Sequence, residues 1–159
     1  MRSVFLAVMA GALLWLQAMP APAYAQDNEP PYWASLKVDR ANMRVGPDRS
    51  YPIDWVYVRE GLPLKVVRKS GGWRLVEDQD GSRGWILGRF LSLDRYAVAI
   101  NDGYAPIYAE ASTGARLLWR AQPGVIGHLG KCANDWCEFR VDEKQGWVQA
   151  EHIWGDGAP

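Results

Sequence analysis

The sequence has no excess of charge of either sign, because 18 Lys and Arg side chains are matched by 18 Asp and Glu side chains in 159 residues. Proteins that bind nucleic acids or anionic membrane surfaces take most of their affinity from clustered basic residues. The balance of charge therefore excludes a nucleic acid as the expected partner.

Helical periodicity is also missing, since no stretch after residue 25 carries a 3.6-residue apolar period long enough for a helix. The chain is instead rich in aromatic and turn-forming residues, with nine Trp, seven Tyr, 16 Gly and 10 Pro. Such a composition is typical of short strands joined by many turns. It predicts an all-β fold.

No apolar run is long enough to span a bilayer, because the longest, residues 4–16, falls short of the ~20 residues that a spanning helix needs. Arg2 precedes this run and a small-x-small site at Ala23-Tyr24-Ala25 follows it, which is the pattern of a secretory signal peptide. We expect residues 1–25 to be removed, and the protein to be periplasmic or secreted without a stable membrane anchor. A permanent anchor is the alternative. No Cys lies near the cleavage site to carry a lipid.

Residues suited to catalysis or metal binding are scarce, with two Cys and two His in the whole chain. No G-x-S-x-G elbow occurs, and His128 and His152 stand alone in the sequence. The acidic segment 77–81 lacks the ligand set of a calcium loop and is interpreted as a hairpin turn. We expect no catalytic residue, no metal site and no cofactor. A carboxylate pair for glycoside hydrolysis stays open, because separations are unknown.

The chain contains two copies of one unit of about 60 residues. Residues 60–66 can be superimposed on residues 123–129. Further along, Trp55 falls on Trp119, Trp73 on Trp136, Val76 on Phe139, Gly84-Trp85-Ile86 on Gly146-Trp147-Val148 and Phe90-Leu91 on His152-Ile153. The offset changes by single residues, which loops tolerate.

Each copy is predicted to contain three strands that are bounded by turn residues. They cover residues 62–68, 73–77 and 83–87 in the first copy and 124–131, 136–141 and 146–149 in the second. Gly71-Gly72 and Asn134-Asp135 are residues that accept the positive φ of a tight hairpin. A longer loop is expected over residues 142–145, and single helical turns near 88–91 and 150–153.

These features together resemble a known family. Residues 38–47, VDRANMRVGP, are similar to the opening of bacterial SH3-like domains, with Asn42, Arg44 and Gly46-Pro47 at the family's positions. The Trp73-x-x-Val76, Gly84-Trp85-Ile86 and Phe90-Leu91 elements resemble the later strands of the family, whereas residues 105–109 replace the opening in the second copy. The resemblance covers residues 36–154 and implies two tandem five- to six-stranded SH3-like β-barrels. It also implies an exported module that binds cell-wall peptidoglycan or a protein without catalysis.

The two cysteines are predicted to form a disulfide. If Asn134-Asp135 is the hairpin loop, Ala133 faces Trp136, and Cys132 then faces Cys137 in a non-hydrogen-bonded pair with Cα atoms ~4.5 Å apart. That separation suits a disulfide, and export places it in an oxidising compartment. The alternatives are a redox couple or a metal site, although the C-x4-C spacing lacks the features of either.

Strand parity separates core residues from exposed ones. Phe139 lies on the core face of its strand and Trp136 on the other, and by the same alternation Trp73 lies away from the core. Trp73 is therefore a candidate ligand-binding residue, in a position that resembles the aromatic wall of eukaryotic SH3 domains. Arg44, Tyr51 and Trp55, on or beside the first long loop, would complete a groove around it. The alternative is that the Trp73 ring is folded under a neighbouring loop.

The prediction is an N-terminal tail over residues 26–35, SH3-like domains over 36–93 and 94–154, and a C-terminal tail over 155–159. The link at residues 92–95 is so short that the domains should abut. The expected function is binding or scaffolding, with peptidoglycan or an envelope protein or peptide as partner. A cell-wall-active enzyme or its accessory subunit is the alternative, and a stress-related structural protein is a third class. Because the second copy lacks the family's opening, we expect repeat one to carry most of the affinity.

Overall fold

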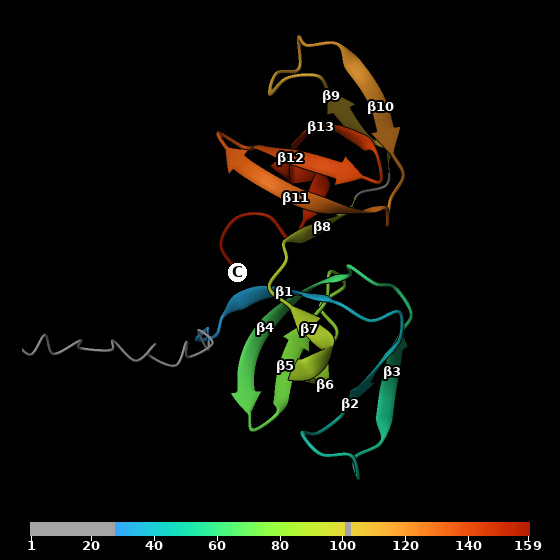
Figure 1. Ribbon diagram of the computed structural model, residues 1–159, viewed down its shortest axis with the longest axis vertical. Helices are drawn as coiled ribbons and strands as arrows, with labels where there is room; N and C mark the ends of the chain where they lie inside the picture. Colours follow the sequence, from blue (N-terminus) through green and yellow to red (C-terminus); the bar gives the residue numbers. More distant parts are fainter. Residues whose placement is uncertain (1–27, 101–102) are drawn as a thin grey trace, which may run out of the picture.

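The computed structural model shows two β-sheet units that follow one another along the long axis of the molecule (Figure 1). It describes residues 28–100 and 103–159. The predicted signal peptide, residues 1–25, lies outside the described residues. No helix in the described ranges is long and apolar enough to cross a membrane.

Repeat one is a seven-stranded antiparallel sheet with the order β3-β2-β6-β5-β4-β1-β7. Its strands are β1 (Tyr32–Leu36), β2 (Ala41–Arg44), β3 (Ile53–Tyr57), β4 (Pro63–Ser70), β5 (Trp73–Glu77), β6 (Arg83–Leu87) and β7 (Leu91–Ser92). A 3-10 turn, η1 (Gly88–Phe90), separates β6 from β7.

Repeat two has the same topology, with the order β10-β9-β13-β12-β11-β8-β14. Its strands are β8 (Tyr96–Ala99), β9 (Ala105–Tyr108), β10 (Leu117–Ala121), β11 (Ile126–Ala133), β12 (Trp136–Val141), β13 (Lys144–Gln149) and β14 (Ile153–Trp154). The turn η2 (Ala150–His152) takes the place of η1. The prediction of an all-β chain with two similar units is confirmed.

Two predicted boundaries and the predicted number of strands need correction. Residues 32–35 were expected in the N-terminal tail but belong to β1, because Ala34 and Leu36 are buried against the core. This strand and the two-residue β7 raise the count to seven strands in place of five or six. The expected loop over residues 142–145 is only Asp142 and Glu143, since Asp142 adopts φ 51° and closes a two-residue turn.

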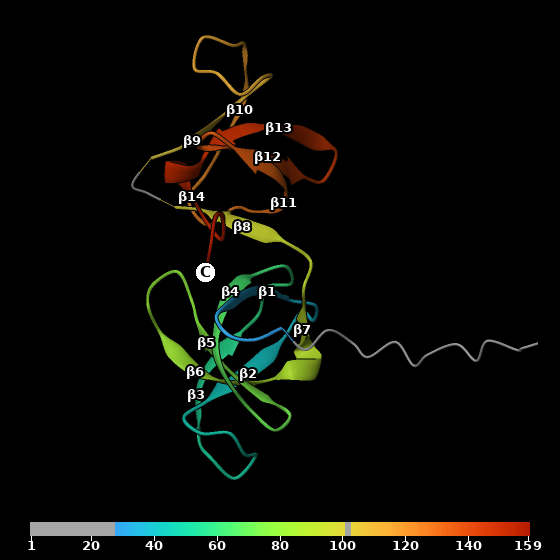
Figure 2. The same ribbon diagram turned by 90° about the vertical axis from the view of Figure 1, so that its left-hand side faces the viewer.

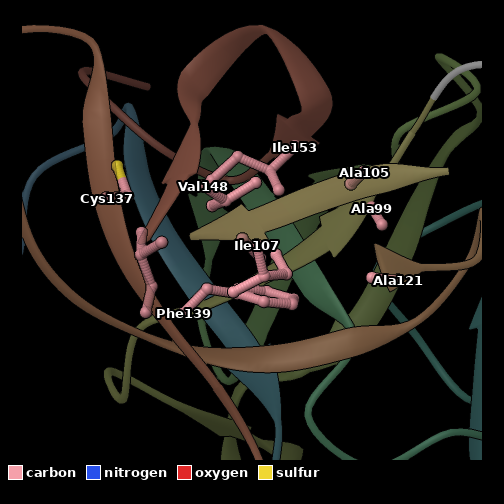
Figure 3. Packing of buried hydrophobic residues seen from close by; sticks show 10 residues of the cluster. Ala99, Ala105, Ile107, Ala121, Cys137, Phe139, Val148 and Ile153 are labelled. Carbon is pink, nitrogen blue, oxygen red and sulfur yellow. The ribbon is translucent and has the colours of Figure 1, made fainter. Parts of the chain in front are cut away.

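Each repeat has its own hydrophobic core. That of repeat one includes Leu36, Leu64, Val66, Val76 and Ile86. The core of repeat two, drawn in Figure 3, includes Ile107, Phe139, Val148 and Ile153 together with the small residues Ala99, Ala105 and Ala121. The predicted parity of β12 is confirmed, because Cys137 and Phe139 are fully buried.

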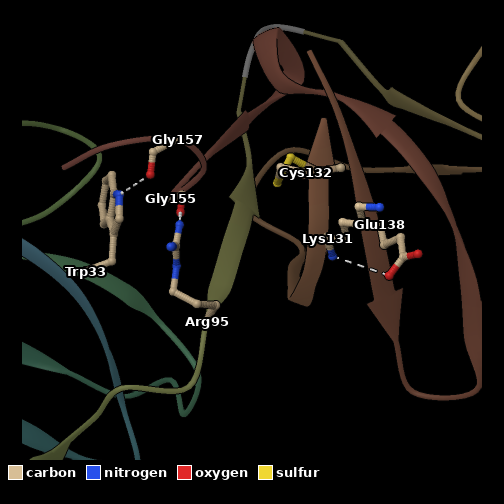
Figure 4. Close-up of a disulfide and its surroundings, with 8 residues drawn as sticks. Trp33, Arg95, Lys131, Cys132, Glu138, Gly155 and Gly157 are labelled. Atoms are coloured by element: carbon tan, nitrogen blue, oxygen red, sulfur yellow. Dashed lines mark hydrogen bonds between the residues drawn. A yellow bond between two sulfur atoms is a disulfide. The ribbon is translucent and has the colours of Figure 1, made fainter. Parts of the chain in front are cut away.

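The predicted hairpin registers are also confirmed. Ser70 pairs with Trp73 across Gly71 and Gly72, and Ala133 pairs with Trp136 across Asn134 and Asp135. Asn134 and Asp135 both adopt positive φ. Cys132 therefore faces Cys137 with a Cα–Cα distance of 4.1 Å, and the two form the predicted disulfide (Figure 4). The corresponding pair in repeat one is Lys69 and Arg74.

Reduction of the disulfide is expected to destabilise repeat two and leave repeat one unchanged. Closing so short a loop contributes about 2 kcal/mol when a disulfide acts through chain entropy. A Cys132→Ser/Cys137→Ser variant should show this loss in urea unfolding, with amide hydrogen exchange assigning it to repeat two. Equal losses in both repeats, or two free thiols in native oxidised protein, would contradict this.

The two repeats contact each other directly, as the short link predicts. Arg59 donates a hydrogen bond to the Gly124 carbonyl at 2.5 Å, and Ser35 donates to the carbonyl of Asp94 in the link at 2.9 Å. The Trp33 indole packs edge-on against Trp154. The C-terminus lies between the repeats in both ribbon views (Figure 2).

The predicted C-terminal tail is part of this junction. The Trp33 indole N–H donates to the Gly157 carbonyl at 3.2 Å, and Arg95 donates to the Gly155 carbonyl at 2.7 Å (Figure 4). Gly155 is buried at φ 112°, and a Cβ there would lie 2.7 Å from the Tyr96 carbonyl oxygen. The last residues therefore tie repeat two to repeat one.

Candidate functional site

Trp73 is the first residue of β5, directly after the Gly71-Gly72 hairpin. It pairs with Leu87 of β6, and its side chain is half-buried. The ring lines a cavity of about 270 Å³ on the outside of repeat one. Trp73 is thus neither fully exposed nor part of the core cluster, which agrees with a groove-lining position.

The groove around Trp73 is basic. It is lined by Asn42, Arg44, Arg49, Trp73, Leu87, Arg89 and Phe90. None of these described lining residues is acidic. Arg44 ends β2, Arg49 belongs to the loop that follows, and Arg89 lies in η1. Three arginines from separate segments therefore line the same groove as one indole ring.

Hydrogen bonds shape the loop that carries Arg49. The Arg44 side chain donates to the Tyr51 carbonyl at 2.6 Å. Asp48 accepts from the Ser50 backbone N–H at 2.9 Å and from the Ser50 hydroxyl at 2.7 Å. These bonds, backbone first, lower the pKa of Asp48, and the charges of Arg44 and Arg49 act in the same direction. Asp48 thus interacts with two of the three arginines, and no acidic residue is among the described residues that line the groove.

The structure separates the four predicted ligand-binding residues. Arg44 and Trp73 share the groove. Tyr51 packs against Gly46, where a Cβ would lie 2.6 Å from its ring, so that Gly46 is needed to seat this loop. Trp55 is 59% exposed and lines a different cavity, of about 380 Å³, at the end of β3. The sequence placed all four near one loop, but β3 carries Trp55 away from Trp73.

Sequence reasoning missed Arg49, Leu87, Arg89 and Phe90 as parts of the groove. Leu87 follows from register, because it is the cross-strand partner of Trp73. Arg89 and Phe90 lie in the predicted helical turn, and the order of strands brings this turn beside Trp73. No local pattern in the sequence signals that proximity.

Repeat two differs at the matching position. Arg44 pairs with Trp85, and its counterpart Tyr108 pairs with Trp147. The Tyr108 ring packs edge-on against Trp136 at 5.7 Å between ring centroids. A neutral ring therefore contacts Trp136 where repeat one presents a cation near Trp73.

The cavity that Trp55 lines also contains a buried hydrogen bond in its wall. The Tyr57 hydroxyl donates to Asp78 at 2.7 Å, and Asp78 also accepts from the backbone N–H groups of Asp80 and Ser82. Burial, followed by the hydrogen bond to Asp78, raises the pKa of Tyr57 well above its ordinary value. The protonated phenol is therefore the form that the folded state requires.

Alkaline pH is expected to destabilise repeat one through Tyr57. The unfolded phenol ionises near pH 10 and the folded one does not, so stability is unaffected below that pH and falls by up to about 1.4 kcal/mol per pH unit above it. Tyr57→Phe should lose about 1 kcal/mol at pH 7. The difference in free energy of unfolding between the wild type and Tyr57→Phe, measured in urea, should decrease from pH 10 to pH 11. A gap that stays constant over this range would contradict the assignment.

The described residues contain no group of three or more His, Cys, Asp or Glu side chains placed to hold a metal ion. Both cysteines are consumed by the disulfide. The chemistry that the groove offers is charge-assisted hydrogen bonding from arginine together with contact on an aromatic ring.

Comparison with known proteins gives one family and several solved structures. The bacterial SH3 domain profile matches residues 37–92 and 101–155. No curated protein matches the chain. An NlpC/P60 family protein from Bacillus cereus is similar at 13% identity and a TM-score of 0.36, over 77% of this chain and 56% of that one.

Two structures from Trichomonas vaginalis are similar to the same degree. NlpC2 has 11% identity and a TM-score of 0.37, over 78% of this chain and 48% of that one. NlpC1 has 12% identity and a TM-score of 0.36, over 84% of this chain and 51% of that one. The chain thus spans about half the length of these structures.

Proposed function

The chain belongs to the bacterial SH3 domain family, and we propose that it is an exported, non-catalytic module that binds carboxylate-bearing peptides of the cell wall through the groove around Trp73. Bacterial SH3 domains commonly bind cell-wall peptidoglycan, and the disulfide fits an extracytoplasmic protein. The finer assignment, to peptide stems with free carboxylates, rests on the chemistry of the groove.

The observation that carries the proposal is that three arginines line one groove together with an indole. Guanidinium groups donate paired hydrogen bonds to carboxylates, and they do so with more geometric specificity than lysine. A half-buried ring beside them gives an extended ligand a surface for its apolar parts. Peptidoglycan stems combine both features, because they carry small apolar side chains and free carboxylates.

Charge reversal in the groove tests this function. Arg49→Glu and Arg89→Glu together are expected to weaken binding to purified sacculi at least ten-fold, since two of three guanidinium donors become repulsive to a carboxylate. Arg116→Glu, an exposed arginine of repeat two, is the matched control and should leave affinity unchanged. Binding should also weaken with rising salt.

The same experiment separates the alternatives. Equal binding by the double variant and the control would overturn the groove as the binding site. Capture of an envelope protein in place of sacculi would assign the module to a protein partner. Release of soluble muropeptides during incubation would indicate an enzyme and contradict the non-catalytic role.

A further inference from the structure

β3 is an edge strand of repeat one, because it pairs with β2 on one side and with no described strand on the other (Figure 1). A free edge presents backbone N–H and C=O groups that another chain can pair with, and proteins usually protect it with charges, proline or a covering segment. The only charge on β3 is Asp54, whereas Ile53, Trp55 and the adjoining Val58 are 47–62% exposed. Exposed apolar side chains gathered at a free edge indicate a site of interaction.

Trp55 is exposed because repeat one lacks the ring that covers its counterpart. In repeat two, Trp119 lies over Phe139 with ring centroids 6.3 Å apart and an angle of 27° between the planes. The register equates Phe139 with Val76, because each pairs with the glycine that precedes the tryptophan of the next strand. Valine offers no ring to stack on, so the Trp55 indole remains exposed beside the cavity of about 380 Å³ that it lines, here named the β3 cavity.

The β3 cavity has an excess of negative charge. Its charged lining residues are Asp78, Asp80 and one cation, Arg59. The Arg59 guanidinium donates to a backbone carbonyl of repeat two, which directs its charge toward the junction. Within residues 28–100 and 103–159, no ion pair includes Asp80 or the neighbouring Asp54, and both side chains are exposed. Two carboxylates at this edge are therefore open to a cation from outside the chain.

The third carboxylate of the site, that of Asp78, is buried and already satisfied. It accepts from the Tyr57 hydroxyl and from two backbone N–H groups of its own turn. Burial, then the hydrogen bond to Asp78, and then the charges of Asp78, Asp80 and Asp54 raise the pKa of Tyr57. All three carboxylates therefore act on one phenol at the end of β3, and the negative charge is concentrated at this point of the edge.

This edge is complementary to a basic segment of another polypeptide. A Lys or Arg side chain is attracted to the face of an indole, and nearby carboxylates add to the attraction. The alkyl stems of Lys and Arg can also cover apolar side chains such as Ile53 and Val58. A second copy of the chain fits less well. Two β3 strands paired antiparallel about Trp55 would place two Asp54 carboxylates at diagonal positions of one seam, where like charges repel.

We propose that β3 is the docking edge for an extended lysine- or arginine-rich segment of a partner protein, which pairs with β3 as a further strand of the sheet. Addition of a strand to a free edge is a general mode of peptide recognition. Since side chains alternate along a strand, every second one lies on the face of Trp55 and brings a cation between the indole and Asp80. The β3 cavity shares no lining residue with the groove around Trp73, so this inference does not depend on the function proposed above.

The test uses the oxidised, ¹⁵N-labelled full chain and a capped decapeptide of alternating lysine and threonine. Binding should shift the Trp55 indole N–H resonance, which the Trp55→Ala variant identifies, and should slow amide hydrogen exchange in β3. Trp55→Ala is expected to weaken binding about ten-fold and Asp80→Lys at least ten-fold. Two matched controls in repeat two should leave the affinity unchanged. They are Tyr104→Ala, at a ring of nearly the same exposure, and Glu143→Lys, in the corresponding turn.

Two further ligands separate strand addition from the attraction of charge alone. A decapeptide of alternating glutamate and threonine should not bind. Spermine, which carries cations without a peptide backbone, should bind at least ten-fold more weakly than the lysine peptide. Equal binding of the two decapeptides, equal binding of spermine, or binding without slower exchange in β3 would overturn the inference. So would equal affinities of Asp80→Lys and Glu143→Lys for the lysine peptide. A free chain that is dimeric, with the β3 amides already protected, would assign the edge to a second copy and contradict the proposal.

Discussion

Replacing Gly146 by valine is expected to destabilise repeat two by about 3 kcal/mol or more. A Cβ at this position would lie 2.5 Å from the Ile107 side chain and 2.8 Å from the Tyr108 carbonyl oxygen. The carbonyl oxygen belongs to the backbone of β9. The steric clash can therefore be removed only if the strand moves, because a change of side-chain rotamer does not move a backbone atom. The free energy of unfolding of a typical domain is only 5–15 kcal/mol, so the expected loss is a large fraction of the total stability.

Gly114→Val is the control for Gly146→Val. Gly114 lies in a loop of the same repeat, and a Cβ there meets only the Ser112 hydroxyl at 3.6 Å. Urea unfolding followed by tryptophan fluorescence should show the loss, and amide exchange should confine it to repeat two. Equal stability of the two variants would show that β9 and β13 can separate without cost. Gly84, the counterpart in repeat one, faces Met43 and the Arg44 carbonyl in the same way.

Replacing Trp73 by alanine is expected to weaken sacculus binding about 30-fold, which corresponds to ~2 kcal/mol for the loss of an aromatic anchor. Trp73 lines the groove together with three arginines and Phe90. Trp136→Ala, at the matching position, should have a smaller effect because Trp136 contacts Tyr108 and lacks an arginine from β9.

Titration of both tryptophan variants, with circular dichroism as the check on folding, distinguishes binding from stability. A folded Trp73→Ala protein with reduced affinity supports the groove. Equal losses for the two variants, or unfolding of the Trp73 variant, would show that this ring supports the fold and does not contact ligand.

The amino-acid sequence by itself determined the repeat, the two hairpin registers and the disulfide. These depend on local chemistry, because Asn134 and Asp135 accept positive φ and the alternation of side chains along β11 and β12 then places Cys132 opposite Cys137. The same alternation placed Phe139 inside and Trp73 outside the core. Neighbours within one hairpin are enough for each of these inferences.

Only the tertiary structure decided which segments meet. The order of the strands brings Arg49 and Arg89 beside Trp73 and carries Trp55 to a different cavity. It also brings Ala99 and Ala121 into the core of repeat two, where repeat one has Leu36 and Tyr57. A side chain that is missing from a core leaves no local pattern, because the space it would fill is bounded by strands distant in sequence. The groove around Trp73 and the cavity at Trp55 therefore arise from packing between strands. The residues that line them can be identified only from the folded structure.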